Sequence, residues 1–366
     1  MKKVFILVDQ MYMYGGIETL VAKKANYWTS QFNYDVTIIA TEQYDKPLAY
    51  DLNTLVKIHD INVNYNRNKS YFSVENLFKL IKNLFKLQSL IFKERPDIII
   101  VASHIPITYI LPFLIRKRKI VKEYHFSKYQ VRHSSFKQKM MNWIDGLYDK
   151  IVVLSKEEAT FYKTSNVEVI PNPIEKIIET SLNNKLKQNQ FVFIGRLVPV
   201  KQIEVLLFIW ESFIQKYPNW KLIIVGPTND SDYANEMTQL VKIKKMETSV
   251  YFAGKSNKVD EYLTSCKALL LTSKQECFPM VIIEAMGSAT PVISFDCPTG
   301  PRNIISHLKD GILVENGNCS QFVEEMCTFV KSIELQNVMA KNALESAKKF
   351  QMHLIMKEWK LKIFET

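Results

Sequence analysis

The sequence lacks the cysteine pattern of a disulfide framework or of a zinc site. Its five cysteines all lie in the second half of the chain, and no two are spaced as C-x2-C: they are Cys266, Cys277, Cys297, Cys319 and Cys327. An odd number without close pairs predicts neither cross-links nor a structural metal. This usage fits a reducing cytosol, where we expect the protein to reside.

The sequence also lacks a long hydrophobic run. The N-terminal segment MKKVFILVD has five apolar residues before Asp9, which is too short for a signal peptide. The most apolar window, residues 98–115, contains His104, Pro106 and Pro112, so we interpret it as a strand followed by a helix and not as a membrane span. No low-complexity tract is present, and we do not expect disorder.

Signatures for a dinucleotide cofactor and for a metal are absent or weak. There is no G-x-G-x-x-G; instead Gly15 and Gly16 occupy the first predicted strand-to-helix turn, where they would either admit a phosphate or sugar or simply form the turn. Asp230 and Asp232 form a D-x-D string, a pair of carboxylates that can hold a divalent ion. We interpret this string as a solvated turn and expect no cofactor and no metal.

The chain is long and basic. Its 366 residues predict two domains, and an apolar fraction of 47% is enough for two cores. The net charge is +11, and residues 1–180 hold 26 Lys and Arg against 18 Asp and Glu, a net of +8. A basic first half favours an anionic partner, which could be nucleic acid, a phosphorylated substrate or an acidic membrane surface.

Short apolar strands alternate with helical patterns twice along the chain, which predicts an α/β protein with two doubly wound, Rossmann-like domains. We place the first domain at residues 1–172 and the second at 173–351, with a polar linker reaching residue 189. The amphipathic segment at about 352–366 is expected to pack back on the first domain. The predicted strands are 4–8, 36–40, 98–102, 120–124 and 150–154, then 190–194, 221–225, 250–252, 268–271, 292–295 and 311–314. In such folds ligands bind outside the carboxyl ends of the strands.

The stretch SKQECFPMVIIEAMGSATP, residues 273–291, has the strongest functional pattern. It places Glu276 in a predicted loop and Glu284 in the helix that follows, at E-x7-E spacing. The N-terminus of that helix favours an anion or a sugar hydroxyl. The alternative is one loop carboxylate and one solvated helical carboxylate.

Three other polar residues follow predicted strands. Arg196 comes after Gly195 at the end of one strand, and Lys201 precedes the next helix, so the pair suits a diphosphate, although isolated basic surface residues would look the same. His125 follows the strand at 120–124 and could contact a sugar hydroxyl or be a structural histidine.

A long helix is predicted from an N-cap at Ser73 to residue 95. We expect one side to pack on the core, with a membrane-surface face as the alternative. The residues assigned to the core side are Leu77, Leu80, Ile81, Leu84, Leu87 and Ile91.

With these features together, the chain resembles the retaining glycosyltransferases of family 4, which have the GT-B fold. The resemblance covers both halves, and its most specific parts are residues 273–291, Gly195-Arg196 with Lys201, and the Gly-Gly turn. It implies a nucleotide-sugar donor held mainly by the second domain, an acceptor held mainly by the first, a deep cleft between them and no required metal.

The resemblance also implies roles for particular residues. Arg196 and Lys201 would bind the donor diphosphate, Glu284 the ribose and Glu276 the transferred sugar. The remaining contacts implied are Gly15 and Gly16 beside the phosphates, His125 near the sugar, Gly254 and Lys255 at the base, and the backbone of Phe278, Pro279, Met280 and Val281. Two positions depart from the family pattern, because Cys277 and Pro227 stand where glycine is common.

The implied activity is transfer of a hexosyl or N-acetylhexosaminyl residue, with retention, from a UDP-sugar to a hydroxyl of a glycan, and the implied glycan is linked to polyprenyl diphosphate. Residues 296–301 resemble members that build bacterial surface polysaccharides such as capsule or O-antigen. Such an acceptor, together with the basic run Arg116–Lys119, predicts a cytoplasmic enzyme on the anionic inner face of the membrane. A nucleotide-sugar epimerase or phosphorylase of this fold is an alternative; a nucleic-acid binder is not expected, because no such motif appears.

Overall fold

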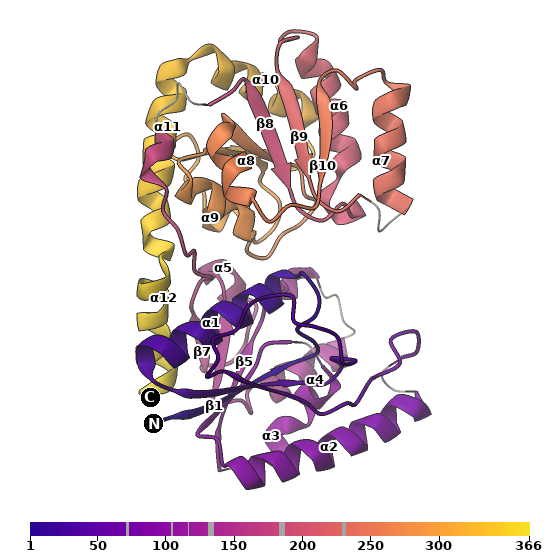
Figure 1. Ribbon diagram of the computed structural model, residues 1–366, viewed down its shortest axis with the longest axis vertical. Coiled ribbons are helices and arrows are strands. Elements are labelled where there is room, and N and C mark those ends of the chain that lie inside the picture. The colour runs from indigo at the N-terminus through magenta and orange to yellow at the C-terminus, as the bar shows by residue number, and fades with distance from the viewer. Residues whose placement is uncertain (71–72, 104, 116, 131–134, 183–186, 229–231) are drawn as a thin grey trace. The chain divides into compact units, whose positions relative to one another are not determined.

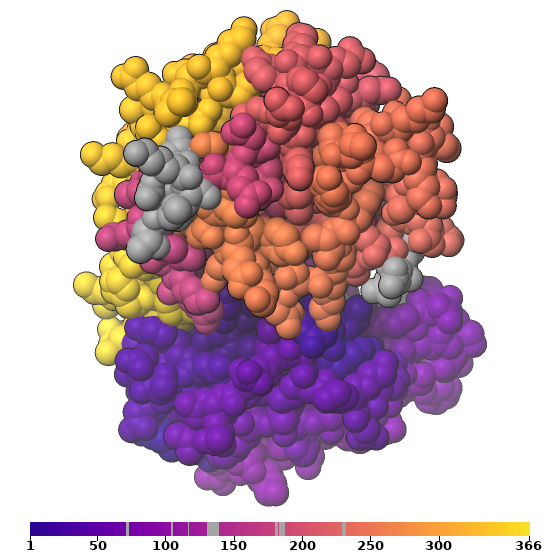
Figure 2. All heavy atoms as spheres, turned by 45° about the horizontal axis from the view of Figure 1, so that its top comes forward, coloured from indigo at the N-terminus to yellow at the C-terminus, as the bar shows by residue number. Residues whose placement is uncertain are grey.

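Two parallel β-sheets flanked by helices make up the computed structural model (Figure 1). The structure describes residues 1–70, 73–103, 105–115, 117–130, 135–182, 187–228 and 232–366 (Figures 1 and 2). The chain divides into unit 1, Met1–Pro171 with Met356–Thr366, and unit 2, Asn172–Ile355. The predicted fold class, two Rossmann-like domains, is confirmed.

In the described part of unit 1, seven strands form one parallel sheet in the order β3-β2-β1-β4-β5-β6-β7. Apolar runs such as VFILV in β1 and IIIV in β4 are buried throughout, as expected for strands covered on both faces. The strands are β1 Lys3–Val8, β2 Asp35–Ala40, β3 Lys57–Asp60, β4 Ile98–Val101, β5 Lys119–Glu123, β6 Lys150–Val153 and β7 Val167–Val169. The helices are α1 Gly16–Phe32, α2 Val74–Glu94, α3 Leu111–Leu114, α4 Ser135–Asp145 and α5 Lys156–Ala159. Helix α12, Met352–Trp359, begins in unit 2 and ends in unit 1.

The two faces of this sheet are covered by different helices. Leu87 of α2, Leu111 of α3 and Ile144 of α4 belong to one buried cluster with Phe5 and Ile99 of the sheet. Helix α1 lies on the other side (Figure 1). There the buried ring of Trp28 packs against Trp359, at 5.3 Å between ring centroids, and against Phe364, at 5.0 Å.

Helix α2 begins after Ser73, which caps it as predicted. Its core side is confirmed in part, since Leu87 is buried and Leu80, Leu84 and Ile91 pack partly buried against the core. Leu77 and Ile81 were assigned to the core side and are exposed, whereas Asn76 and Asn83 are buried. Both side-chain amides donate hydrogen bonds inside the domain: Asn83 donates to the hydroxyl of Tyr65 at 3.0 Å, and Asn76 donates to the carbonyl of Asn66 at 3.0 Å. The fully buried side of α2 therefore consists of these two asparagines and Leu87.

In the described part of unit 2, six parallel strands follow the order β10-β9-β8-β11-β12-β13. They are β8 Gln190–Ile194, β9 Lys221–Val225, β10 Val250–Gly254, β11 Ala268–Leu271, β12 Val292–Phe295 and β13 Ile312–Val314. The helices are α6 Ile203–Ile214, α7 Asp232–Ile243, α8 Val259–Ser265, α9 Met280–Gly287, α10 Cys319–Lys331 and α11 Ile333–Ala347. The strand order turns back between β8 and β11, which is the kind of position where open α/β sheets bind ligands.

Most predicted strands are confirmed to within one or two residues, but β3 and β7 were missed. Lys57–Asp60 is an exposed edge strand of sequence KIHD, which has none of the apolar run by which the buried strands were recognised. Among the described residues, no helix is both long enough and apolar enough to cross a bilayer.

Candidate functional site

Three loops of unit 2 meet at the carboxyl ends of β8, β9 and β10. The amide of Gly195 donates to the carbonyl of Val225 at 3.0 Å, and the amide of Gly226 donates to the carbonyl of Gly254 at 2.9 Å. A Cβ on Gly226 would collide with the carbonyl oxygen of Gly195. Only glycine therefore allows the loop after β9 to pack this closely under the loop that carries Arg196.

Lys201 and Glu276 form an ion pair at this edge of the sheet. The 3-10 turn Pro199–Lys201 places the Lys201 Nζ at 2.5 Å from the Glu276 Oε1, and the two side chains are 18% and 11% exposed. The backbone supports the pair, because the amide of Lys274 donates to the carbonyl of Val200 at 2.9 Å. The β8–α6 loop and the β11–α9 loop are thus joined into one cation–carboxylate site.

The loop after β12 holds Glu276 from the other side. The Thr299 hydroxyl donates to the Glu276 carbonyl at 2.7 Å. A Cβ on Gly300 would lie 2.5 Å from the Cβ of Glu276. The backbone of the loop after β12 therefore packs directly against the Glu276 side chain. Burial, followed by the negative charge of Glu276, raises the pKa of the nearby Cys297 thiol to about 12. Cys297 therefore adds no charge to the site at neutral pH.

The helix after Glu276 brings the second glutamate and a set of backbone N–H groups. Helix α9 starts at Met280 with Pro279 as its N-cap, and proline has no side-chain oxygen to cap the first turn. The N–H groups at Met280 and Val281 open this helix, while Phe278 is buried against Phe350 at 5.8 Å. Glu284 lies in the second turn and is partly exposed. An anion or a sugar hydroxyl suits such a helix start.

The other predicted donor residues of unit 2 lie on the same three loops. Arg196 is exposed directly after β8 and Gly195. Gly254 ends β10, and its neighbour Lys255 is exposed. Arg196 comes from the end of β8, and Gly254 and Lys255 come from the end of β10, the two strands that flank β9.

In unit 1, Gly15 is the N-cap of α1 and Gly16 its first residue. A Cβ on Gly15 would collide with the carboxylate of Glu18, which accepts a hydrogen bond from the Gln10 amide at 3.0 Å. A Cβ on Gly16 would meet no atom within 4 Å. A side chain at position 15 would therefore displace the Glu18 carboxylate, whereas position 16 is open to a close approach by a ligand.

His125 lies just beyond β5 in a buried charge cluster. Its Nε2 is 3.2 Å from the Glu123 Oε2, and the same carboxylate pairs with Lys24 of α1. Although burial opposes ionisation, attraction to Lys24 and His125 outweighs it and lowers the pKa of Glu123 to about 2. The side chains of Lys24 and Glu123 are each 3% exposed. His125 is therefore positioned by a carboxylate that stays charged.

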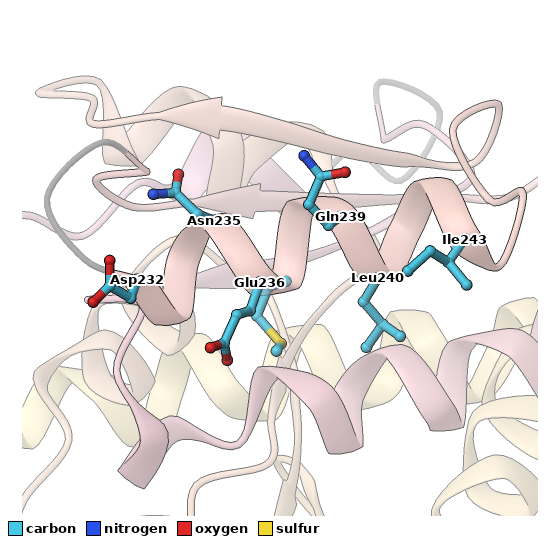
Figure 3. Close-up of a pocket in the computed structure, with 7 residues that line it drawn as sticks. Asp232, Asn235, Glu236, Gln239, Leu240 and Ile243 are labelled. Carbon is cyan, nitrogen blue, oxygen red and sulfur yellow. The ribbon is translucent and has the colours of Figure 1, made fainter.

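The predicted D-x-D string falls only partly within the structure. Asp230 lies outside the described residues, as does Arg116 of the basic run, and Asp232 is exposed at the start of α7 (Figure 3). The depression shown there is lined by residues of α7 alone, and none of the candidate donor residues belongs to it. Over the part of the chain that the structure describes, no group of three His, Cys, Asp or Glu side chains could hold a metal ion.

Sequence reasoning identified Lys201 and Glu276 but missed Thr299, Gly300 and the Lys24–Glu123 pair. Thr299 and Gly300 were noted only within a stretch resembling surface-polysaccharide enzymes, and nothing in their spacing indicates a contact with Glu276. Lys24 is one of two adjacent lysines in a helix, and its partner is 99 residues away. The sequence signal that could have predicted this pair is the position of Lys24 among apolar residues of its helix, which indicates a buried lysine in need of a carboxylate partner.

Two protein-family models match the chain. Residues 14–176 match the model described as Glycosyltransferase Family 4, and residues 174–346 match the model described as Glycosyl transferases group 1. The two matches adjoin near the boundary between the units and together cover the elements that carry the candidate residues.

Individual proteins are similar over the full length. An amylovoran biosynthesis glycosyltransferase, AmsD of Erwinia amylovora, is 29% identical over 98% of this chain and 99% of its own length. An uncharacterized glycosyltransferase of Haemophilus influenzae is 27% identical over the same shares. The solved structure of Anabaena Alr3699/HepE in complex with UDP-glucose superposes with a TM-score of 0.77 at 17% identity and covers 100% of both chains. At that identity the likeness shows a shared fold.

Proposed function

The chain belongs to family 4 of the glycosyltransferases and has the GT-B fold, and we propose that it transfers a hexosyl or N-acetylhexosaminyl residue from a UDP-sugar, with retention at the anomeric carbon, to a hydroxyl of a glycan. Glycosyltransferase activity follows from the family. The donor, the retaining course and independence of metal ions are our proposals, as is a polyprenyl-diphosphate-linked acceptor at the cytoplasmic face of the membrane.

The observation that carries the proposal is the Lys201–Glu276 pair. Residues 75 positions apart in the sequence meet at 2.5 Å at the carboxyl edge of the unit 2 sheet, beside the start of α9. An ammonium group suits a diphosphate, and a carboxylate suits sugar hydroxyls, so one site can hold both parts of a nucleotide sugar. The Anabaena protein of the same fold is solved with UDP-glucose, which supports a UDP-sugar as the donor.

The chemistry proposed for this site is electrostatic. As the bond between the anomeric carbon and the diphosphate oxygen breaks, negative charge grows on the diphosphate, and Arg196 and Lys201 stabilise it. The acceptor oxygen bonds to the anomeric carbon on the same face, and its proton passes to the departing phosphate oxygen. The products are the lengthened glycan and UDP. No side chain has to act as a base or as a covalent nucleophile, and Glu276 orients the sugar.

The proposed role in polysaccharide synthesis is supported by the relative from Erwinia amylovora, which is named as a glycosyltransferase of amylovoran biosynthesis. A growing surface glycan carried on a lipid diphosphate is the acceptor class that we propose. Unit 1 would receive this acceptor, with Gly16 open to a close approach at the start of α1 and with His125 3.2 Å from the Glu123 carboxylate.

The test is a panel of nucleotide sugars incubated with the purified chain, first in thermal-shift assays and then with glycan acceptors in EDTA. We expect UDP and one UDP-sugar to raise Tm, and UDP release to require an acceptor. Conversion of the donor without acceptor would identify an epimerase, and dependence on orthophosphate alone a phosphorylase. Activity lost in EDTA and restored by Mn²⁺ would overturn metal independence.

A further inference from the structure

Helix α2 of unit 1 has apolar residues on two opposite faces. The inner face packs on the sheet through Leu87, with Leu84 and Ile91 partly buried beside it. On the opposite face five apolar side chains are exposed, at spacings of three, four or seven residues that align them along the helix. This outer stripe consists of Val74, Phe78, Ile81, Phe85 and Phe92.

The phenylalanines of the outer stripe are highly exposed to solvent. Phe78 and Phe85 are each 69% exposed, and Phe92 is 80% exposed. Single exposed apolar residues are ordinary on a protein surface, but an aligned row of large ones is typical of a surface that contacts a protein or a membrane. The core does not need these side chains, because the asparagine-bearing edge of α2 already faces the sheet.

Charge along α2 selects an anionic partner. The helix has four lysines against two glutamates, and Glu75 is already paired with Lys69 at 3.0 Å and with Lys79 at 2.9 Å. Lys82 and Lys93 are exposed along one border of the outer stripe. Phenylalanines on one face with lysines at its border are the composition of helices that lie in the plane of an anionic membrane.

Neighbouring helices of the same layer add to this surface. Phe113 of α3 and Trp143 of α4 are exposed, and their rings are 5.4 Å apart. Since α2, α3 and α4 contribute to one core cluster on one face of the sheet, these aromatic side chains belong to the same layer as the outer stripe. Aromatic residues of this kind settle at the level of lipid headgroups.

We propose that α2 docks unit 1 on an anionic membrane, with the outer stripe buried at the boundary between headgroups and acyl chains and with Lys82 and Lys93 among the headgroups. This membrane contact deepens the proposed function, and it depends on that function only in the proposal that the acceptor is lipid-linked. This contact is distinct from membrane attachment through the basic run Arg116–Lys119. In that run the Lys119 Nζ already donates hydrogen bonds within the domain, to the carbonyl of Ile363 at 2.6 Å and to the Thr366 hydroxyl at 2.6 Å.

The experiment is co-sedimentation of the full chain with vesicles of phosphatidylcholine and phosphatidylglycerol, at low and high salt. In F78Q/F85Q/F92Q we expect vesicle binding to fall by at least about tenfold, including the part that survives high salt, because apolar insertion is insensitive to screening. K82E/K93E should lose mainly the salt-sensitive part. The matched control is F208Q, since Phe208 is a 54% exposed phenylalanine on a helix of unit 2.

Insertion has its own readout in F85W. Relative to wild type, the added fluorescence should be quenched by brominated lipids in the vesicles, whereas F208W should not be quenched. Transfer to a water-soluble glycan acceptor should be unchanged in F78Q/F85Q/F92Q. Vesicle binding by a chain that transfers no sugar would separate a failure of the proposed function from a failure of this contact.

Three outcomes overturn the proposal. The first is equal vesicle binding by wild type and F78Q/F85Q/F92Q. The second is loss of binding in K117E/R118E but not in the phenylalanine variant, which would return the contact to the basic run. The third is a dimer of the free chain, seen by analytical ultracentrifugation and abolished in F78Q/F85Q/F92Q, without vesicle binding; the outer stripe would then be an interface between two copies.

Discussion

The two units have the same alternating architecture and use their charged residues differently. Among the described residues, unit 1 buries seven charged side chains and unit 2 buries two: Glu18, Lys24, Glu42, Lys122, Glu123, Asp145 and Glu158 in the first, Lys187 and Asp310 in the second. The principal ion pair of unit 2, Lys201–Glu276, lies instead at a loop edge and is partly exposed. Charges in unit 1 therefore join elements inside the domain, whereas the site charges of unit 2 remain accessible to a ligand.

The largest effect expected from this comparison is on the stability of unit 1. Lys24→Met leaves Glu123 charged and buried beside His125, and breaking a buried pair in this way costs about 3–5 kcal/mol. Urea denaturation, with hydrogen exchange to assign the loss to unit 1, measures it. Lys57→Met is the control, because the Lys57–Asp35 pair is at the surface and should cost about 0–1 kcal/mol. Equal losses in the two variants would contradict the assignment.

The same pair gives a pH dependence. Because the folded pKa of Glu123 is about 2 and its ordinary value is 4.5, the pair contributes fully above pH 4.5 and loses its contribution as the pH falls toward 2. The stability difference between wild type and Lys24→Met should therefore shrink below pH 4.5. A difference that is constant from pH 7 to pH 3 would show that Glu123 does not carry it.

The next largest effect is on activity and comes from unit 2. Lys201→Ala should slow transfer by about 2–4 kcal/mol, roughly 30- to 1,000-fold, and weaken UDP binding while leaving Tm nearly unchanged. Steady-state kinetics and UDP titration measure this. The control is Lys244→Ala, which removes another partly exposed lysine of unit 2 paired at 2.5 Å, with Glu211. Wild-type rates in Lys201→Ala would remove the diphosphate role.

A smaller and more selective effect separates the two glutamates of the site. Glu284→Ala should weaken UDP binding by about 1.5–3 kcal/mol, because a ribose contact does not depend on the sugar. Glu276→Ala should spare UDP and slow transfer. Calorimetric titration with UDP, together with kcat, distinguishes them, and a reversed pattern would mean that the two roles are exchanged.

The smallest effect concerns the residue that positions Glu276. Thr299→Val removes the hydrogen bond to the Glu276 carbonyl and should raise the activation free energy by about 0.5–1.5 kcal/mol, which lowers kcat roughly two- to thirteenfold, with UDP affinity unchanged. Thr299→Ser keeps the hydroxyl and should restore kcat. If both variants lose the same activity, the methyl contact and not the hydrogen bond is responsible.

The sequence allowed much of this architecture to be predicted, since apolar runs such as Ile98–Val101 identify buried parallel strands without further information. It located Lys201 and Glu276 through a family resemblance, but their direct pairing depends on how two loops pack. The orientation of α2 was wrong in part because apolar spacing fits either side of a helix that is apolar on both. Asn76 and Asn83 decided it, through hydrogen bonds to residues outside the helix.

Unit 1 is built from two segments of the chain that are far apart in the sequence, and this has a consequence for its biosynthesis. Residues Met356–Thr366 complete this domain, and their rings of Trp359 and Phe364 cover Trp28, which has no exposed surface. A ribosome makes this segment only after all of unit 2. Until then Trp28 of the nascent first domain stays uncovered. Unit 1 can therefore be completed only after unit 2 has been translated, although its sheet is synthesised first.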